Sequence, residues 1–298
     1  MIKKVTLEND YERMIPEFHK DTLTYAEHIT RYQCALDIVA DKVVLDIASG
    51  SGYGTKMLAE SAKFVYGVDV NEEAVKYARQ EYGGKNIEYI LGDGEKIPLE
   101  DSSVDVVTTF ETIEHIKDYR KFIKEVKRVL KPDGLALVST PNDLEFAEGN
   151  HFHLHEFEQE ELIGLLQKDF THIKPYFQAT WKVAMLGEAV ELSKSFDKPL
   201  PTLNLAPLPK EKFLYFYFIC SNRQITESVK TVAALGEHYS DRSLQDERQR
   251  DKLYRKKLED KIRAINEELD LIKNSRTYGL ARKITNSKNR IKRTIRKK

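Results

Sequence analysis

A glycine-rich turn is the first stretch of this sequence able to hold a ligand. It follows the apolar residues 43–45 and an acid, Asp46, and it has glycine at positions 50, 52 and 54. Glycine permits positive φ angles and lets a ligand approach the backbone closely, because it has no Cβ. A buried strand that ends in such a turn before a helix is typical of the ligand crevice of open α/β sheets.

The spacing within this turn excludes two common nucleotide-binding motifs. Thr55 stands where a dinucleotide fingerprint needs its third glycine. A P-loop needs glycine and lysine followed by serine or threonine, whereas here Gly54 is followed by Thr55 and then Lys56. What remains is an Asp-x-Ala-x-Gly-x-Gly-x-Gly pattern that begins at Asp46.

Acids stand at the ends of the next two expected strands. Asp69 lies 23 residues after Asp46, where open α/β folds place a carboxylate that accepts hydrogen bonds from ribose hydroxyls. Asp93 lies between two glycines after the third strand, where it can accept from the exocyclic amine of adenine. A glycine turn and two acids at three successive strand ends predict a site for an adenosyl ligand.

Over roughly residues 25–222 the chain resembles the class I S-adenosylmethionine-dependent methyltransferases. The resemblance is carried by VVLDIASGSGYGT, YGVDV, LGDGEKIP, VDVVTTFETIEHIKD and EVKRVLKPDGLALVSTPN. It implies S-adenosyl-L-methionine as the cofactor, a methyltransferase activity, and an α/β, Rossmann-like fold with a seven-stranded sheet.

The same resemblance implies a set of cofactor contacts. Gly50 and Gly52 pass under the methionine part, Asp69 holds the ribose, and Asp93 holds the adenine. The full predicted set is Asp46, Ala48, Gly50, Gly52, Tyr53, Asp69, Val70, Asp93, Gly94 and Glu111, in which Asp46 supports the loop and Glu111 borders the methionine end. The family usually has glycine at the position of Ala48, and alanine fits there if its φ is negative.

The segment from Glu111 to His115 follows the fourth expected strand, at the mouth of the crevice. Methyl transfer to a hydroxyl oxygen needs the hydroxyl proton removed, and histidine is suited to that near neutral pH. We predict His115 as the general base, with Glu114 beside it. A purely structural histidine is the competing interpretation.

A second hypothesis treats the E-x-x-E-H box as part of a metal site. Glu111, Glu114 and His115, joined by His155, would offer mixed oxygen and nitrogen ligands to Mg²⁺ or Mn²⁺. The box resembles that of ubiquinone-biosynthesis O-methyltransferases and of small-RNA 2′-O-methyltransferases, and the latter also share an H-x-F-E segment like residues 155–158. Alternatively, the histidines at 151–155 mark an extended, half-exposed segment.

Alternating strand-like and helix-like segments from residue 43 to about 140 predict a parallel sheet with crossover helices. Strands are expected at 64–70, 86–91, 104–110, 135–140, 172–178 and 212–220, and helices at 56–62, 71 onward, 119–130 and 159–166. We expect a helical segment at 1–40 and a methyltransferase domain at 41–223. Four prolines between 199 and 209 favour a substrate cap at about 179–210.

The composition is that of a soluble protein, and its zero net charge hides an asymmetry. Residues 273–298 hold 11 of the 48 basic residues and no acid, which leaves 37 basic against 48 acidic residues and a net charge of −11 in the first 272. The sequence has no apolar run long enough to span a membrane, no secretory h-region and no C-x-x-C pair. We expect a cytoplasmic protein in which Cys34 and Cys220 are buried free thiols.

The C-terminal part of the sequence predicts two helical segments, and each has the pattern of a binding surface. Apolar residues at 240–272 follow an imperfect a/d seam, which favours a short coiled coil and a homo-oligomer, or a helix packed on its own domain. Residues 273–298 place apolar residues at helical spacing among lysines and arginines, which favours an anionic membrane surface. Nucleic-acid attraction and a disordered solubilising tail are the alternatives.

We predict O-methylation of a sugar hydroxyl on a nucleotide sugar or glycan. The E-H-x-x-R-Y box at 27–32 and residues 275–282 resemble methyltransferases of bacterial surface-polysaccharide gene clusters, which suggests a role in polysaccharide biosynthesis. An RNA 2′-O-methyltransferase, a quinone or lipid-linked O-methyltransferase, and a non-enzymatic assembly module are the alternatives.

Overall fold

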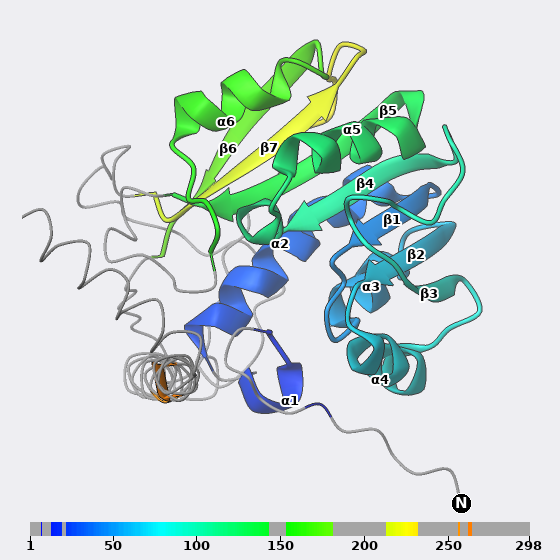
Figure 1. Cartoon of the computed structure of the whole chain (residues 1–298). Coiled ribbons are helices and arrows are strands. Elements are labelled where there is room, and N and C mark those ends of the chain that lie inside the picture. The colour runs from blue at the N-terminus through cyan, green and yellow to red at the C-terminus, as the bar shows by residue number, and fades with distance from the viewer. Residues whose placement is uncertain are drawn as a thin grey trace, which may run out of the picture. The chain divides into compact units, whose positions relative to one another are not determined.

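The computed structural model describes residue 7, residues 13–19, 22–142, 153–180 and 213–231, and residues 256, 262 and 263 (Figure 1). The chain divides into two units, Met1–Ser243 and Leu244–Lys298, and each is considered by itself. The predicted tail at 273–298 and nearly all of the predicted cap and coiled coil lie outside the described residues, so these three remain predictions from sequence.

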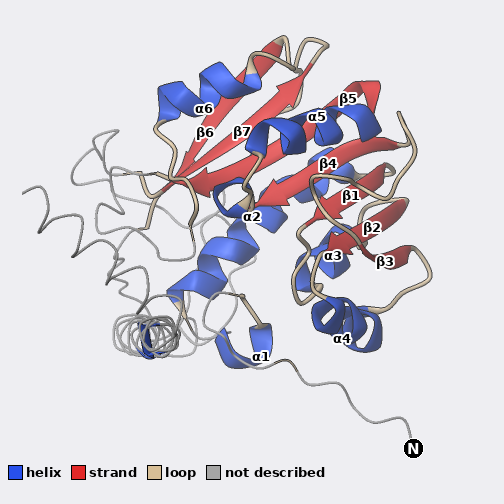
Figure 2. Ribbon diagram, viewed as in Figure 1, coloured by secondary structure: helices blue, strands red, loops and turns tan. Residues whose placement is uncertain are grey.

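Seven strands of the described part form one mixed sheet (Figure 2). They are β1 (Val43–Ile47), β2 (Phe64–Asp69), β3 (Ile87–Leu91), β4 (Val104–Phe110), β5 (Leu130–Pro141), β6 (His172–Gln178) and β7 (Tyr215–Ser221). Their order is β3-β2-β1-β4-β5-β7-β6, and only β7 runs antiparallel to its neighbours. The predicted seven-stranded, Rossmann-like sheet is confirmed. The strand order reverses between β1 and β4, and that reversal is where such sheets open a crevice.

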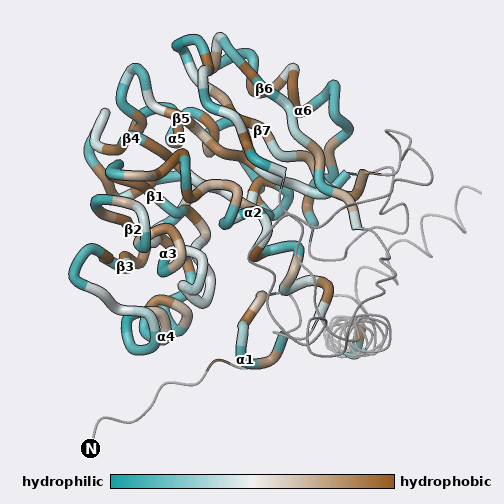
Figure 3. The backbone as a smooth tube through the Cα atoms, turned by 180° about the vertical axis from the view of Figure 1, so that it is seen from behind, coloured by the Kyte–Doolittle hydropathy of each residue, from teal (hydrophilic) through white to brown (hydrophobic). Residues whose placement is uncertain are grey.

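Helices cover both faces of the sheet because its strands are apolar on both sides. On β1, Val44 packs with α2 (Leu23–Val39) and α3 (Tyr53–Leu58), while Leu45 packs with α5 (Tyr119–Val129) and α6 (Gln159–Leu166). Hydrophobic residues recur along the central strands (Figure 3). The remaining elements are α1 (Pro16–His19), α4 (Glu72–Tyr82) and the 3₁₀ turn η1 (Ile113–His115).

Three element starts differ from the sequence prediction by three residues or more. Strand β7 begins at Tyr215, after the predicted residue 212. Helix α3 begins at Tyr53, before the predicted residue 56, because Gly52 turns the chain directly into the helix with a left-handed φ of 91°. Strand β5 begins at Leu130, before the predicted residue 135, because Leu130 pairs with Val104 across a register shift in β4. The cap that Asn71 was predicted to provide for α4 is confirmed, since its side chain accepts from the amide of Ala74.

One of the two cysteines departs from the prediction that both are buried. Cys220 is buried on β7, but Cys34 is only half-buried, because it lies on α2 beside the buried positions rather than among them. Both thiols are free. No helix in the described ranges is long and apolar enough to cross a membrane.

Candidate active site

Asp46 joins three elements beneath the glycine turn. Its carboxylate accepts hydrogen bonds from Thr55 Oγ1 at 2.7 Å on α3 and from Thr108 Oγ1 at 2.8 Å on β4, and the Tyr32 hydroxyl on α2 lies 3.3 Å away. Burial raises the pKa of Asp46 to about 6. Asp46 therefore supports the loop from below, as predicted, and Thr55 replaces a third glycine because its hydroxyl is used here.

The glycine turn adopts left-handed backbone at three positions. Gly50 has a φ of 55°, Gly52 a φ of 91°, and Ala48 a φ of 60°. The expectation that φ is negative at Ala48 is wrong, because the turn needs a left-handed residue there whichever residue type is present. Alanine in this region costs about 1 kcal/mol. A Cβ at Gly52 would lie 2.5 Å from Ala78, so this glycine also permits close packing on α4.

Asp69 connects the glycine turn to the end of β2. One carboxylate oxygen accepts from the amide of Gly50 and the other from the amide of Asn71, both at 2.8 Å. The residue is 7% exposed. The structure thus holds a carboxylate at the edge of the crevice, with each oxygen retaining capacity for a further donor.

Two apolar side chains lie exposed beside Asp69. Val70 is 73% exposed and Leu91, the register partner of Asp69 on β3, is 49% exposed. A flat aromatic group of a ligand could lie over these two apolar side chains and shield them from water, next to the polar groups at the strand ends. Val70 was in the predicted set, whereas Leu91 was not.

Asp93 and Gly94 begin the connection between β3 and β4. Asp93 is exposed, and its side chain accepts from the amide of Glu95 at 2.8 Å. A Cβ at Gly94 would lie 3.0 Å from the Phe122 ring, so the glycine lets this connection pack tightly on α5.

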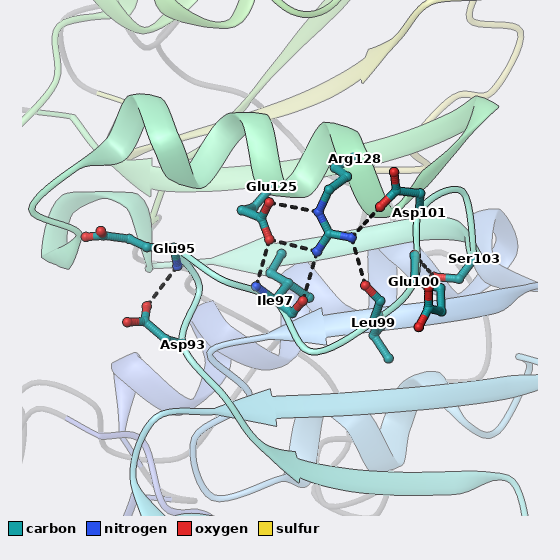
Figure 4. A network of polar contacts seen from close by, with 9 residues as sticks. All are labelled: Asp93, Glu95, Ile97, Leu99, Glu100, Asp101, Ser103, Glu125 and Arg128. Carbon is teal, nitrogen blue, oxygen red and sulfur yellow. Dashed lines mark hydrogen bonds and ion pairs between the residues drawn. The ribbon is translucent and has the colours of Figure 1, made fainter.

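Arg128 on α5 fixes the same connection from its other end (Figure 4). Its guanidinium donates to the carbonyl oxygens of Ile97 and Leu99 at 2.9 and 2.8 Å, and to Asp101 at 2.7 Å. Glu125 pairs with it through both carboxylate oxygens, each at 2.8 Å. The sequence prediction did not include Arg128, because nothing in its local pattern shows which distant carbonyls it will meet.

Arg31 and Glu111 form a charged pair at the carboxyl end of β4. Glu111 adopts a left-handed φ of 53° and accepts from Ser139 Oγ at 3.0 Å, while Arg31 Nη1 lies 4.0 Å from its Oε1. Burial raises the pKa of Glu111, and the charge of Arg31 offsets part of that rise. Arg31 is only 2% exposed; Nη1 donates to Gln178 Oε1 at 2.8 Å, and its Cζ lies 4.7 Å from the Tyr215 ring centroid.

Two nitrogens of Arg31 are buried without a partner. Among the described residues, Nε and Nη2 have no hydrogen-bond acceptor. Buried guanidinium nitrogens without acceptors are costly, so the geometry suits an anionic group of a ligand. The sequence showed the E-H-x-x-R-Y box but could not place Arg31, because its position depends on how α2 packs against β6 and β7.

Tyr53 lies at the start of α3 with its hydroxyl 2.8 Å from Nδ1 of His28. The two groups share a hydrogen bond, and burial lowers the pKa of His28 well below its usual value. The Tyr53 ring also packs edge-on against Tyr32 at 5.5 Å. This predicted cofactor residue therefore fixes α2 to the glycine turn.

The E-x-x-E-H box forms η1 directly after β4. Glu114 is buried and accepts from Thr140 Oγ1 at 3.0 Å, and burial raises its pKa well above the usual range. Donor atoms of Glu114, His115 and His153 all lie within 4.8 Å of one another. Burial and the neighbouring His115 lower the pKa of His153 to about 4.

Two of the four predicted metal ligands, Glu111 and His155, do not join this group. His155 has other partners. Its Nε2 lies 2.8 Å from Glu161 Oε1, and its ring packs on Phe157 at 4.4 Å. His153 takes its place. Residues two apart would share a side in a fully extended segment, but the chain bends at Leu154, so the two histidines point to different neighbours. The presence of two histidines two residues apart was the sequence signal, and it did not show which of the two faces the site.

The described domain has the Rossmann-like methyltransferase fold, by its sheet order and by its likeness to solved structures. N-methyltransferase NodS of Bradyrhizobium japonicum, in complex with S-adenosyl-L-homocysteine, matches with a TM-score of 0.52 and 16% identity, over 72% of this chain and 95% of that one. At that identity the likeness concerns the fold alone.

Sequence comparisons find similarity to methyltransferases over part of the chain. Residues 45–138 match the family model of a methyltransferase domain. A probable S-adenosylmethionine-dependent methyltransferase of Mycolicibacterium smegmatis is 38% identical over 161 residues, covering 52% of this chain and 62% of that protein. Demethylmenaquinone methyltransferase of Corynebacterium glutamicum is 33% identical over 109 residues, covering 36% of this chain and 46% of that protein. The chain thus spans about three fifths, or less, of these curated relatives.

Proposed function

We propose that this chain transfers a methyl group from S-adenosyl-L-methionine to a sugar hydroxyl, on a nucleotide sugar or a glycan. The observation that carries the cofactor part is the position of Asp69. Its carboxylate is held by two backbone amides beside the glycine turn, next to the exposed Val70 and Leu91. A ribose on Asp69 and an adenine over the two apolar side chains would satisfy both features.

The charged pair at β4 supports the same cofactor. The methionine part of S-adenosyl-L-methionine carries an ammonium and a carboxylate. Glu111 and Arg31 offer one charge of each sign within 4.0 Å, and Arg31 has two buried nitrogens without described partners. Opposite buried charges favour a zwitterionic ligand group, because each ligand charge then meets its complement.

The polar side chains beside the proposed methionine end support an acceptor that carries a hydroxyl group. Glu114, His115 and His153 lie together directly after β4, next to the proposed methionine end. In methyl transfer an acceptor oxygen attacks the methyl carbon in line with the breaking carbon–sulfur bond, and S-adenosyl-L-homocysteine leaves as a neutral thioether. The hydroxyl proton passes to the Glu114–His115–His153 group, where an imidazole is suited to accept it near neutral pH.

A sugar fits this mouth better than an RNA does. The first 272 residues carry a net charge of −11, which repels a polyanion, and binding to RNA relies on phosphate contacts with basic groups. An uncharged glycan meets no such repulsion, and a nucleotide sugar, with one diphosphate group, meets less of it than an RNA with a phosphate at every nucleotide. The basic residues at 273–298 lie outside the described part of the chain.

A quinol is the second candidate acceptor, and one comparison favours it. The relative from Corynebacterium glutamicum acts, by its name, on demethylmenaquinone. The likeness covers 36% of this chain and 46% of that protein. A quinol-specific site would also need an apolar slot for the ring.

Product analysis tests the proposal. The full chain is incubated with S-adenosyl-L-methionine and, in separate reactions, with nucleotide sugars, neutral oligosaccharides, short RNA and demethylmenaquinol in vesicles. We expect S-adenosyl-L-homocysteine to form with a sugar acceptor, whose mass rises by one methyl group. Methylation of demethylmenaquinol or RNA instead would overturn the sugar assignment, and failure to bind S-adenosyl-L-methionine would overturn the proposal as a whole.

A further inference from the structure

Three side chains with metal-ligating atoms meet where two segments of the chain are joined. Glu114 and His115 lie on η1, and His153 lies on the segment that leads to α6. The carbonyl oxygen of Glu114 accepts from the amides of Leu154 at 2.7 Å and His155 at 3.2 Å. These backbone bonds hold the two segments together independently of the three side chains, so the group is preorganised.

Glu114, a member of this group, has one buried carboxylate oxygen without a described partner. The residue is 1% exposed, and Thr140 donates to its Oε2 at 3.0 Å, which fixes the carboxyl group. Its Oε1 is also buried and has no hydrogen-bond partner within the described ranges. A buried carboxylate oxygen without a partner is costly, and a cation would satisfy it.

His153 is oriented as metal-binding histidines usually are. Its Nδ1 lies 3.1 Å from Glu156 Oε1, and its side chain is 7% exposed. An imidazole that donates one N–H to a carboxylate carries its lone pair on the other ring nitrogen, and such a carboxylate fixes the ring of a ligating histidine. The His115 ring packs edge-on against it, with the ring centroids 5.0 Å apart.

We propose that Glu114, His115 and His153 bind one divalent transition-metal ion of the Mn²⁺ or Zn²⁺ type. Two imidazoles and one carboxylate suit these ions, whereas Mg²⁺ prefers oxygen ligands alone. Ligand atoms around one such ion lie about 3 to 4 Å apart. The three ligand atoms lie within 4.8 Å of one another, so the widest separation needs to close by about 1 to 2 Å. Positions not filled by protein remain open to a ligand.

The role of the ion rests on the proposed function, although its binding does not. An acceptor hydroxyl coordinated to the ion would lose its proton more readily, because the ion lowers the pKa of the hydroxyl. With Glu114, His115 and His153 bound to the ion, that proton would pass to solvent water instead of to one of these side chains. His115 would then serve as a ligand rather than as the general base. The position of the site directly after β4 places it beside Glu111, at the proposed methionine end of the cofactor.

Metal titration of the full chain tests the site directly. The protein is first dialysed against a chelator, and Mn²⁺, Zn²⁺ and Mg²⁺ are titrated calorimetrically. We expect one Mn²⁺ or Zn²⁺ per chain, with Mg²⁺ binding at least tenfold more weakly. Glu114→Gln and His153→Gln should each lower Mn²⁺ affinity at least tenfold, and Glu156→Gln about tenfold, as removal of a carboxylate partner of a ligating histidine does.

His155→Gln is the matched control, because it removes the neighbouring histidine of the same segment. It should bind Mn²⁺ like the unaltered chain. Absence of saturable binding, equal losses in His153→Gln and His155→Gln, or equal affinity for Mg²⁺ would each overturn the site. S-adenosyl-L-methionine binding is measured on every variant: retained cofactor binding shows that the variant is folded, so a loss of metal binding alone concerns the metal site and not the proposed cofactor.

Discussion

Asp46 is the residue on which the glycine turn rests, and its burial makes the turn sensitive to pH. Three hydroxyls from α2, α3 and β4 surround its carboxylate, yet burial still raises its pKa from 3.8 to about 6. Because the folded-state pKa lies above the unfolded one, the folded chain binds more protons between pH 4 and pH 6. Stability from this residue is therefore present at low pH and lost as the pH rises through about 6.

Comparison with Asp46→Asn isolates this effect, because other carboxylates titrate equally in both proteins. The free energy of unfolding of the unaltered chain, minus that of the variant, should fall by about 1.4 kcal/mol between pH 5 and pH 7.5. Urea denaturation at the two pH values measures it. A difference that stays constant or rises with pH would show that Asp46 has no raised pKa.

Arg31 gives a second prediction at the residue scale. If its buried nitrogens hold the methionine carboxylate, Arg31→Gln should lower the affinity for S-adenosyl-L-methionine about 10- to 100-fold, the loss expected for a charged hydrogen bond. Methylthioadenosine, which lacks the amino-acid end, should bind the variant within twofold of the unaltered chain. Equal losses for both ligands in calorimetry would mean that Arg31 only supports the fold.

Among the elements, the connection between β3 and β4 depends most on a partner distant in sequence. Arg128 on α5 holds the carbonyls of Ile97 and Leu99, and so fixes the end of the turn that begins at Asp93 (Figure 4). The guanidinium is 30% exposed, which weakens each contact through solvent screening. Arg128 still fixes the shape of the connection, because the five N–H donors of its guanidinium bind several groups at once.

Arg128→Gln should therefore loosen the adenine side of the crevice. We expect S-adenosyl-L-methionine and methylthioadenosine to lose affinity by the same factor, about three- to tenfold, because they share the adenosine group. Arg120→Gln, which alters an exposed arginine of the same helix, is the control and should bind both ligands normally. If only S-adenosyl-L-methionine lost affinity, Arg128 would act on the methionine end of the cofactor and not on its adenosine, which would contradict the prediction.

Element boundaries could be predicted from sequence where local pattern decides them. Strand β4 and helix α6 begin and end as predicted, since their apolar periodicity is closed by turn residues. The start of β5 could not be found in this way, because residues after 130 extend only through pairing with β4. Helix α3 begins early because Gly52 adopts a left-handed backbone that the sequence permits but does not require.

At the scale of the whole molecule, the parallel sheet explains which site residues were predictable. Asp46, Asp69 and Asp93 lie at or just after the carboxyl ends of β1, β2 and β3, and parallel strands bring these ends to one edge of the sheet. Arg31 and His153 come from α2 and from the segment before α6, which reach that edge only by tertiary packing. The sequence therefore predicted the proposed cofactor side of the crevice more completely than the side that faces the acceptor.

Calorimetric titration of S-adenosyl-L-methionine into the full chain, the Asp69→Asn variant and the Glu72→Gln variant tests the central claim most directly. Glu72 is an exposed carboxylate at the start of α4, close to Asp69 in sequence, and serves as the control. We predict one cofactor per chain, normal binding by Glu72→Gln, and at least tenfold weaker binding by Asp69→Asn, because charged hydrogen bonds to the ribose are lost. Equal affinity of Asp69→Asn and the unaltered chain would contradict the assignment of this crevice to the cofactor.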